Sequence, residues 1–195
     1  MNTRTHRAGR LAAAALFASV ALAACAGTTS STPPSTSGSG TVATTAASGQ
    51  VLPVTDNPIN NTSTVEALKI DSVLVENNVD TSGSATDDHL EIAVTNTGSS
   101  ELTGFEVYYT FTDPTAGTSE SYFTKLSDSF TVPAGASRII HFDNTGALDH
   151  YPVNEFSLYA TSLNALDVTV EVSAHGAAPQ TTTVHKDAGG QETAD

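Results

Sequence analysis

Cysteine is nearly absent from this chain of 195 residues, and tryptophan is absent altogether. The single cysteine, Cys25, cannot form an intramolecular disulfide, so it serves another purpose or none. Without tryptophan, a carbohydrate-binding surface loses one of its frequent sugar platforms. The one methionine is Met1, which leaves no internal thioether for a copper(I) carrier site.

Basic residues are also scarce, with seven Lys or Arg against 21 Asp or Glu. Three of the seven lie in the first ten positions, so residues 25–195 carry four basic residues against all 21 acids, a formal charge of −17. A surface this acidic repels nucleic acid and anionic lipid headgroups. We therefore expect no nucleic-acid binding, and a folded part that its charge keeps soluble.

The first 24 residues have the pattern of an export signal. Arg4, Arg7 and Arg10 precede an apolar run from Leu11 to Ala24, in which only Ser19 is polar. As a helix this run is about 21 Å long, which is too short for a bilayer core that needs about 20 residues. Residues 1–24 are therefore predicted to be a secretory signal peptide.

The end of this segment, Leu22-Ala23-Ala24-Cys25, resembles the lipobox of bacterial lipoproteins. The resemblance implies cleavage between Ala24 and Cys25, a diacylglycerol on the Cys25 sulfur, and a fatty acid such as palmitate on the new amine. It also implies that buried acyl chains hold the protein on the extracytoplasmic face of the cell membrane. The alternative is an ordinary signal peptide, cleaved after an A-x-A-like site, with Cys25 as a spectator.

Residues 25–60 have the composition of a stalk that follows the anchor. Between residues 26 and 50, 13 of 25 positions are Ser or Thr, and Asp56 is the first charged residue after Cys25. Such a segment cannot bury enough apolar surface to offset its conformational entropy. We predict a flexible spacer with an end-to-end distance of roughly 33 Å, whose Ser, Thr and Pro content also permits O-glycosylation.

Short alternating runs begin after residue 64, and no stretch there carries a sustained helical stripe. The alternation predicts a break or bulge at Asp71-Ser72 in the first strand. Seven or eight strands predict an all-β fold, an antiparallel two-sheet sandwich. The strands are expected around residues 68–75, 90–95, 105–111, 121–126, 138–142, 156–160, 166–172 and 181–184.

Two turns carry a resemblance to the Ig-like domains of bacterial surface proteins. They are Thr95-Asn96-Thr97-Gly98, at the end of a strand, and Val132-Pro133-Ala134-Gly135. The resemblance covers most of residues 65–175 and implies an Ig-like sandwich, but the Cys…Trp…Cys signature of immunoglobulins is missing. We place the domain at residues 61–186 and a polar tail at 187–195, and we expect Phe and Tyr to pack the core.

Catalytic motifs are missing from the chain. It contains no G-x-S-x-G, no S-x-x-K, no Walker loop, no G-x-G-x-x-G that opens a helix and no H-E-x-x-H. The acids Glu91, Glu106 and Glu171 alternate with apolar residues, so they are expected to face solvent and not each other across a cleft. We therefore expect a protein that is not an enzyme and that has no cofactor.

Histidine and aspartate gather in three places that are candidates for a metal site. Asp87-Asp88-His89 precedes a strand, His141 and Asp143 lie two residues apart near the end of another, and Asp149-His150 follows. If the loops meet at one end of the sandwich, these residues offer ligands for Zn²⁺ or Cu²⁺, or carboxylates for Ca²⁺. We name His89, His141 and Asp143 as candidate ligands. The alternative is that they are solvated loop residues.

Together these features predict a non-enzymatic cell-surface protein, anchored by lipid on Cys25, that displays an Ig-like interaction or accessory module. Its expected partners are the membrane, through the anchor, and an extracytoplasmic protein or envelope component. The alternative is an extracytoplasmic solute- or metal-binding module, which a ligand-dependent rise in melting temperature would reveal.

Overall fold

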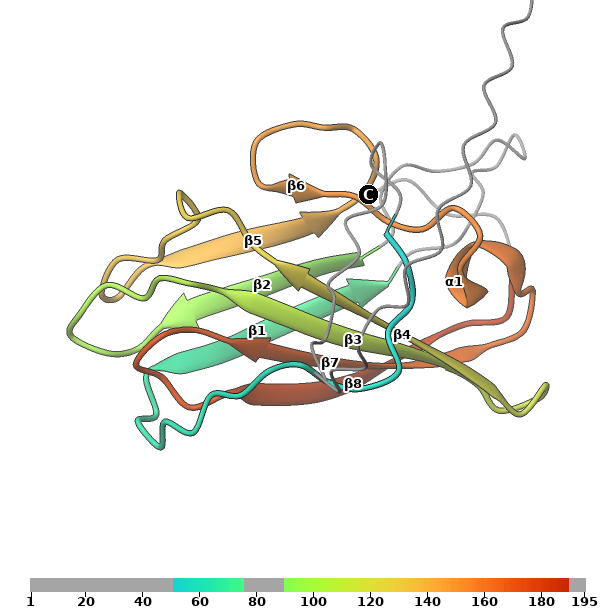
Figure 1. Cartoon of the computed structure of the whole chain (residues 1–195), viewed down its shortest axis with the longest axis horizontal. Helices are drawn as coiled ribbons and strands as arrows, with labels where there is room; N and C mark the ends of the chain where they lie inside the picture. Colours follow the sequence, from blue (N-terminus) through green and yellow to red (C-terminus); the bar gives the residue numbers. More distant parts are fainter. Residues whose placement is uncertain (1–50, 76–89, 190–195) are drawn as a thin grey trace, which may run out of the picture. The chain divides into compact units, whose positions relative to one another are not determined.

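The computed structural model describes residues 51–75 and 90–189, all of which belong to one of two compact units, residues 43–195. They form eight strands and one short helix, α1 (Leu158–Thr161) (Figure 1). The strands are β1 (Leu68–Val75), β2 (Leu90–Asn96), β3 (Glu106–Asp113), β4 (Thr118–Lys125), β5 (Ser137–Phe142), β6 (His150–Tyr151), β7 (Leu166–Ser173) and β8 (Gln180–Lys186).

The strands are divided between two sheets of four (Figure 1). The first sheet has the order β1-β2-β5-β6 and the second has the order β4-β3-β7-β8. All neighbours are antiparallel except β5 and β6, which are parallel. After β2 the chain crosses to the second sheet, where it forms β3 and β4, and it then returns to the first sheet, where β5 pairs with β2. These connections are those of an Ig-like Greek key. The predicted all-β, two-sheet sandwich is confirmed.

The core lies between the sheets and is formed by alternate side chains of the strands. In β2 and β3 every second side chain is fully buried. Aromatic rings fill this core: Phe105 and Phe130 meet edge to face with centroids 5.2 Å apart, and Tyr109 of β3 stacks on Tyr122 of the neighbouring β4 at 5.4 Å. These geometries are the favourable ones for aromatic pairs. The expectation that the aromatic residues pack the core is confirmed for these four.

The irregularity expected at Asp71-Ser72 is a β-bulge. The pairing of β1 with β2 shifts register between Ile70 and Ser72, which leaves Asp71 without a partner in the ladder. The Asp71 carboxylate accepts a hydrogen bond from Lys69 Nζ at 2.6 Å and another from the Thr95 hydroxyl. These hydrogen bonds lower the pKa of Asp71, so the bulge carries an anion that is tied to both strands.

Asn96, the last residue of β2, joins the two turns that carried the Ig-like resemblance. Its Nδ2 donates to the carbonyl oxygens of Ser100 at 2.7 Å and Val132 at 2.8 Å. Its Oδ1 accepts the N–H of Gly98, and its own carbonyl accepts the N–H of Gly135, both at 2.9 Å. Asn96 is fully buried, and its hydrogen bond to Val132 is buried with it, so the loss of this amide would leave a buried carbonyl without a partner.

The strand expected over residues 156–160 is wrong, because α1 begins inside it. The side chain of Ser157 caps this helix by accepting the N–H of Ala160 at 3.2 Å. Phe156, which the alternation assigned to a strand face, lies before the cap and is 72% exposed. The apolar residues at alternate positions fit a strand, but the local hydrogen bonding of the serine favours a helical turn.

The ten residues before the expected domain boundary at residue 61 lie against the folded domain. Residues 51–61, which we call the strap, run across the second sheet before β1 (Figure 1). The N–H of Val54 donates to the carbonyl of Ser121 in β4 at 2.8 Å, and Asn57 Nδ2 donates to Glu171 of β7 at 2.8 Å. The sequence predicts no strand in the strap, because its apolar residues are interrupted by Pro53 and Pro58 and do not alternate regularly.

Replacing Asn96 with alanine should destabilise the domain by about 2 kcal/mol, because two carbonyls and one N–H lose a partner and the Val132 carbonyl among them is buried. Urea unfolding of Asn96→Ala against the parent chain measures this change. Thr97→Ala is the matched control, since the Thr97 side chain is exposed and reaches only the Glu66 carbonyl at 3.5 Å. Equal losses in both variants would contradict the role assigned to the Asn96 amide.

Candidate functional site

The candidate site residues fall into two groups. The predicted cleavage and lipid-attachment residues Leu22, Ala23, Ala24 and Cys25, and the candidate ligand His89, lie outside the described residues. His141 is in β5, and Asp143 follows its end. In the part of the chain that the structure describes, no helix has the length and apolar character that a membrane crossing requires.

A pair of histidines lies on the outer face of the first sheet. His141 faces outward from β5, and β6 places His150 beside it in a parallel pairing. The two rings stack with centroids 4.4 Å apart and planes 8° apart. His141 Nδ1 lies 3.0 Å from Glu91 Oε1 on the neighbouring β2, but it is not aligned for a hydrogen bond. Three strands therefore build one row of ionisable groups.

Asp143 contacts the histidine pair from the buried side. Its carboxylate is fully buried and contacts His150 Nδ1 at 2.5 Å. The backbone N–H and the hydroxyl of Thr145 donate to Asp143 Oδ1 at 2.8 and 2.7 Å. Burial raises the pKa of Asp143, but the hydrogen bonds from His150 and Thr145 outweigh it and leave the pKa lowered. An ionised Asp143 thus fixes the orientation of the His150 ring.

The stacked arrangement is unsuited to a metal ion held by both rings. A metal bound to imidazole lies near the ring plane, about 2.0–2.1 Å from the nitrogen, and two nearly parallel planes share no such point. Among residues 51–75 and 90–189, no group of three or more His, Cys, Asp or Glu side chains is placed to hold a metal. The structure therefore brings His141, Asp143 and His150 together, but as a ring stack and a carboxylate–imidazole contact.

The Asp143–His150 pair resembles the half of a catalytic triad in which a carboxylate orients an imidazole. A triad also requires a nucleophile on the opposite nitrogen, Nε2. The hydroxyl of Thr145 lies 3.2 Å from His150 on the Nδ1 side, and that side already faces the carboxylate. Thr145 is therefore placed to stabilise Asp143 and not to act as a nucleophile.

Asp149, the neighbour of His150 in the sequence, takes a different partner. Its carboxylate forms an ion pair with the guanidinium of Arg138. Arg138 also lies 4.3 Å above the centre of the Phe130 ring and donates to the carbonyl of Thr131 at 2.9 Å. The ion pair connects β5 with the loop before β6 and so holds His150 in the row.

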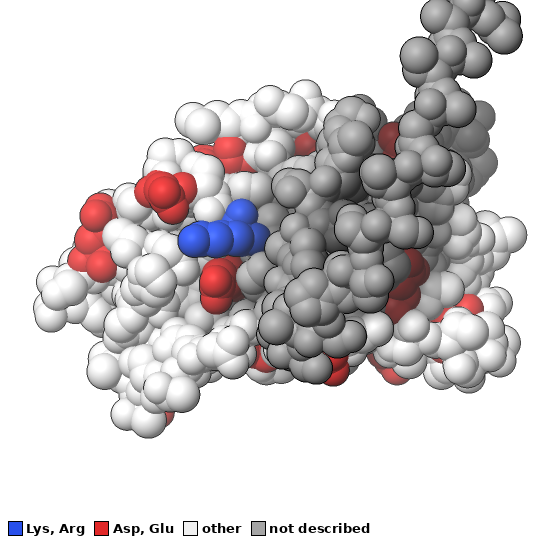
Figure 2. Space-filling view, viewed as in Figure 1, with Lys and Arg blue, Asp and Glu red and all other residues white. Residues whose placement is uncertain are grey.

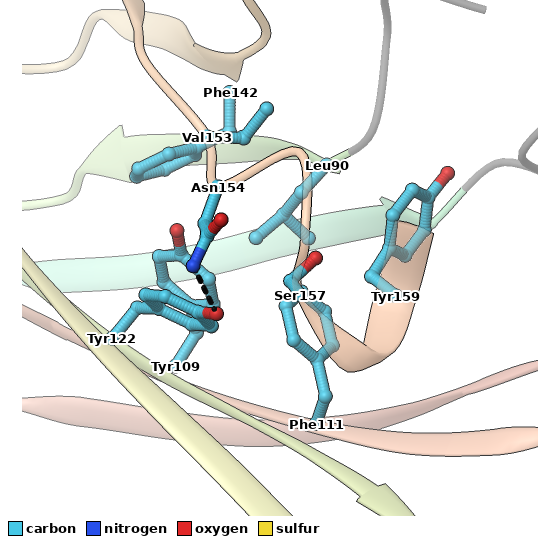
Figure 3. A pocket seen from close by; sticks show the side chains of 9 residues that line it. All are labelled: Leu90, Tyr109, Phe111, Tyr122, Phe142, Val153, Asn154, Ser157 and Tyr159. Atoms are coloured by element: carbon cyan, nitrogen blue, oxygen red, sulfur yellow. Dashed lines mark hydrogen bonds between the residues drawn. The ribbon is translucent and has the colours of Figure 1, made fainter. Parts of the chain in front are cut away.

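The interior contains one small cavity between the sheets and the segment around α1 (Figure 3). Its volume is about 10 Å³, which is near the minimum that one water molecule needs. In Figure 3, Asn154 points toward Tyr122 and donates to its hydroxyl at 3.1 Å. The cavity is lined by Leu90, Tyr109, Phe111, Tyr122, Phe142, Val153, Asn154, Ser157 and Tyr159.

The tyrosines beside this cavity belong to a buried network and not to a ligand site. Tyr122 donates to Glu120 Oε1 at 2.5 Å, and Glu120 Oε2 accepts the N–H of Leu158 at 2.7 Å. Burial raises the pKa of both Tyr109 and Tyr122, and the charge of Glu120 adds to the effect. Both phenols therefore stay neutral, and Glu120 joins β4 to the start of α1.

Lys186, at the end of β8, was not singled out in the sequence, yet it is the most unusual charged group that the structure describes. It is only 1% exposed, and its Nζ has no hydrogen-bond partner. The Nζ lies 5.5 Å from the centre of the Tyr159 ring, a favourable cation–π distance. Burial lowers the pKa of Lys186, and the nearby Asp187 charge opposes this only in part. A lysine at the last inward position of a strand gives no sequence signal of its own.

Comparison with known proteins adds little to this description. No family model matches the chain, and no curated protein matches it. A solved structure named SoR45, a structural genomics target, is 11% identical over 62% of this chain and 86% of its own, with a TM-score of 0.39. A Bordetella pertussis structure with the name ApaA is 13% identical over 64% of this chain and 94% of its own, with a TM-score of 0.36. The fold assignment therefore rests on the strand pairings.

Replacing Lys186 with methionine should stabilise the domain by about 1–2 kcal/mol at pH 7, because it removes a buried charge without a hydrogen-bond partner and keeps the side-chain volume. The pKa of Lys186 is lowered in the folded state, so the parent gains stability as the pH rises through that pKa toward 10.5. The difference in unfolding free energy between the two chains should therefore narrow as the pH rises toward 10.5.

Urea unfolding at pH 7 and at pH 10 measures both effects. Lys125→Met, at an exposed position of β4, is the matched control and should change stability by less than about 0.5 kcal/mol. A loss of stability in Lys186→Met at pH 7 would show that the amine has a favourable partner.

Proposed function

We propose that this chain is a non-enzymatic, lipid-anchored protein of the extracytoplasmic membrane face, whose sandwich is an interaction or accessory module. The observation that carries the proposal is the order of features at the start of the chain. Three arginines, a short apolar run and the sequence Leu22-Ala23-Ala24-Cys25 come directly before a Ser/Thr-rich segment. This order resembles the export signal and lipobox of bacterial lipoproteins.

The start of the folded domain is consistent with a tethered module. The described residues begin at Val51, which packs against the core. With Cys25 as the anchor, residues 26–50 are the spacer. A flexible coil of that length has an end-to-end distance of about 25–30 Å, somewhat less than the roughly 33 Å expected for a stalk reaching residue 60. This distance is enough to hold the domain clear of lipid headgroups.

The outer face of the first sheet favours an interaction role. Ala93 of β2 pairs with Ile139 of β5, and Leu74 of β1 pairs with the adjacent Glu91. Leu74 and Ile139 are 42% and 44% exposed, so two apolar side chains reach solvent on this face, in the rows of Glu91 and Ala93. Together with the histidine pair they give this face a mixed apolar and polar surface, which is the composition of many protein contacts.

The charge of the chain limits the chemistry of its partner. The formal net charge is −14, and Figure 2 shows acidic side chains at several separate places on the face in view, with basic ones gathered in one place. Such a surface associates more readily with neutral or basic partners than with anionic ones. We therefore favour an envelope protein as partner over a nucleic acid or an anionic lipid surface.

Cys25→Ser should release the protein from the membrane, because the lipid and not the polypeptide is proposed to hold it there. Fractionation of cells that produce the full chain, with intact-mass analysis of the mature protein, measures the change. Ala26→Ser is the matched control, since it introduces the same side chain next to an intact thiol. A Cys25→Ser protein that stays in the membrane fraction, or a parent N-terminus without lipid, contradicts the proposal.

The alternative function, a metal-binding module, is favoured by one observation, which is that Asp143 orients His150 as carboxylates orient metal-ligating histidines. Our proposal predicts that millimolar Zn²⁺, Cu²⁺ or Ca²⁺ leaves the melting temperature of residues 26–195 unchanged. The alternative predicts that the metal raises the melting temperature. The rise should be absent in His150→Ala and present in His185→Ala, which changes an exposed position of β8. Differential scanning calorimetry distinguishes the two.

A further inference from the structure

The strap has two parts that differ in how firmly they are held. Seven of the ten residues from 51 to 60 are exposed, and the other three, Val51, Val54 and Ile59, are only half-buried, with Val51 packed against the core. Among the described residues, the hydrogen bonds that join this part to the sheets are the one from Val54 to Ser121 and the exposed one from Asn57 to Glu171. Segments with few buried contacts and exposed hydrogen bonds open locally at low free energy.

The last residue of the strap, Asn61, is held differently. Its Nδ2 lies within hydrogen-bond distance of three acceptors, Ser173 Oγ at 2.9 Å and the carbonyls of Ala174 and Ala177 at 2.9 and 2.8 Å. Its Oδ1 accepts the N–H of Ser63 at 2.9 Å. The three acceptors come from the end of β7 and the turn before β8, so Asn61 ties the strap to a rigid part of the second sheet.

We propose that residues 51–60 form a releasable strap, which docks on β4 in one state and becomes part of the tether in the other, with Asn61 as the fixed stop. In the docked state the strap meets the free edge of β4 at one point, the isolated bridge of Val54 with Ser121. In the released state that bridge and the Asn57 contact with Glu171 are both broken.

The released state also changes the reach of the domain. Ten residues span at most about 33–36 Å when fully extended, which is more than the predicted end-to-end distance of residues 26–50. Tension between the anchor and a bound partner acts on residue 51 first, and it peels the strap before it reaches the sandwich. This response to tension depends on the proposed lipid anchor. The docked and released states of the strap do not depend on the anchor.

Amide hydrogen exchange on the full chain carrying Cys25→Ser tests the two states without the anchor. The Val54 amide reports the docked strap, and the Ala178 amide, which bonds to the Val65 carbonyl at 2.7 Å, reports the chain just beyond the stop. We expect Val54 to exchange at least 100-fold faster than Ala178. Equal exchange rates would overturn the proposal, because the strap would then open only with the whole domain.

The matched pair Asn61→Ala and Asn60→Ala tests the stop. The Asn60 side chain contacts only the Pro58 carbonyl within the strap, so Asn60→Ala should keep the ratio of the two rates. Asn61→Ala should raise the Ala178 rate by tenfold or more, because opening then continues past residue 61. An unchanged Ala178 rate in Asn61→Ala refutes the stop.

A disulfide across the docked pair provides a test that does not depend on the stability of Asn61→Ala. In the Cys25→Ser background, Val54→Cys with Ser121→Cys leaves these two as the only cysteines. Oxidation should slow thermolysin cleavage within residues 51–60 by tenfold or more, and reduction should restore it. Cleavage at the same rate in both redox states shows that docking does not control this segment.

Discussion

The hydrogen bonds of the buried Asn96 amide link the end of β2 to the turn that leads into β5. The Asn96 side chain donates a hydrogen bond to the carbonyl of Val132, and the Asn96 backbone carbonyl accepts one from the N–H of Gly135. A slip of one residue in either strand would break these bonds and would turn the core side chains outward. The register of β2 and β5 therefore depends on this contact, and so does the row in which Glu91 faces His141.

The histidine pair follows from that register. Because His141 is at an outward position of β5, a parallel two-residue strand is enough to bring His150 against it. Asp143 lies one residue past the strand end and turns into the interior, where it holds His150 from the other side. The row is thus a product of pairing geometry, and its side chains contact one another instead of leaving ligand positions that converge on one point.

Much of the fold was predictable because its causes are local. Alternating apolar residues defined the strands, and the polar interruption at Asp71 marked the bulge. The helix at Leu158 was not predicted because a run of five residues fits the apolar spacing of a strand as well as that of a helix. The hydrogen bond that favours the helix comes from the side chain of Ser157. β6 was missed because two residues carry no periodicity.

The candidate site was less predictable, because its partners come from different strands. The sequence placed His141, Asp143 and His150 near one another, but it gave no sign that the rings stack. Lys186 gave no signal, since a lone lysine at the end of a strand is normally solvated. Cys25 and His89 remain predictions from the sequence, outside the residues that the structure describes.

The strap also makes the two outer faces of the sandwich unequal. On the second sheet, Asn57 of the strap donates to Glu171 of β7, and the chain itself crosses that side before entering β1. The exposed Ile139 lies on the other sheet and has no such cover from the strap. A molecule that approaches the domain therefore meets two chemically different sides. The strap already covers part of the outer face of the second sheet, and it leaves the outer face of the first sheet uncovered.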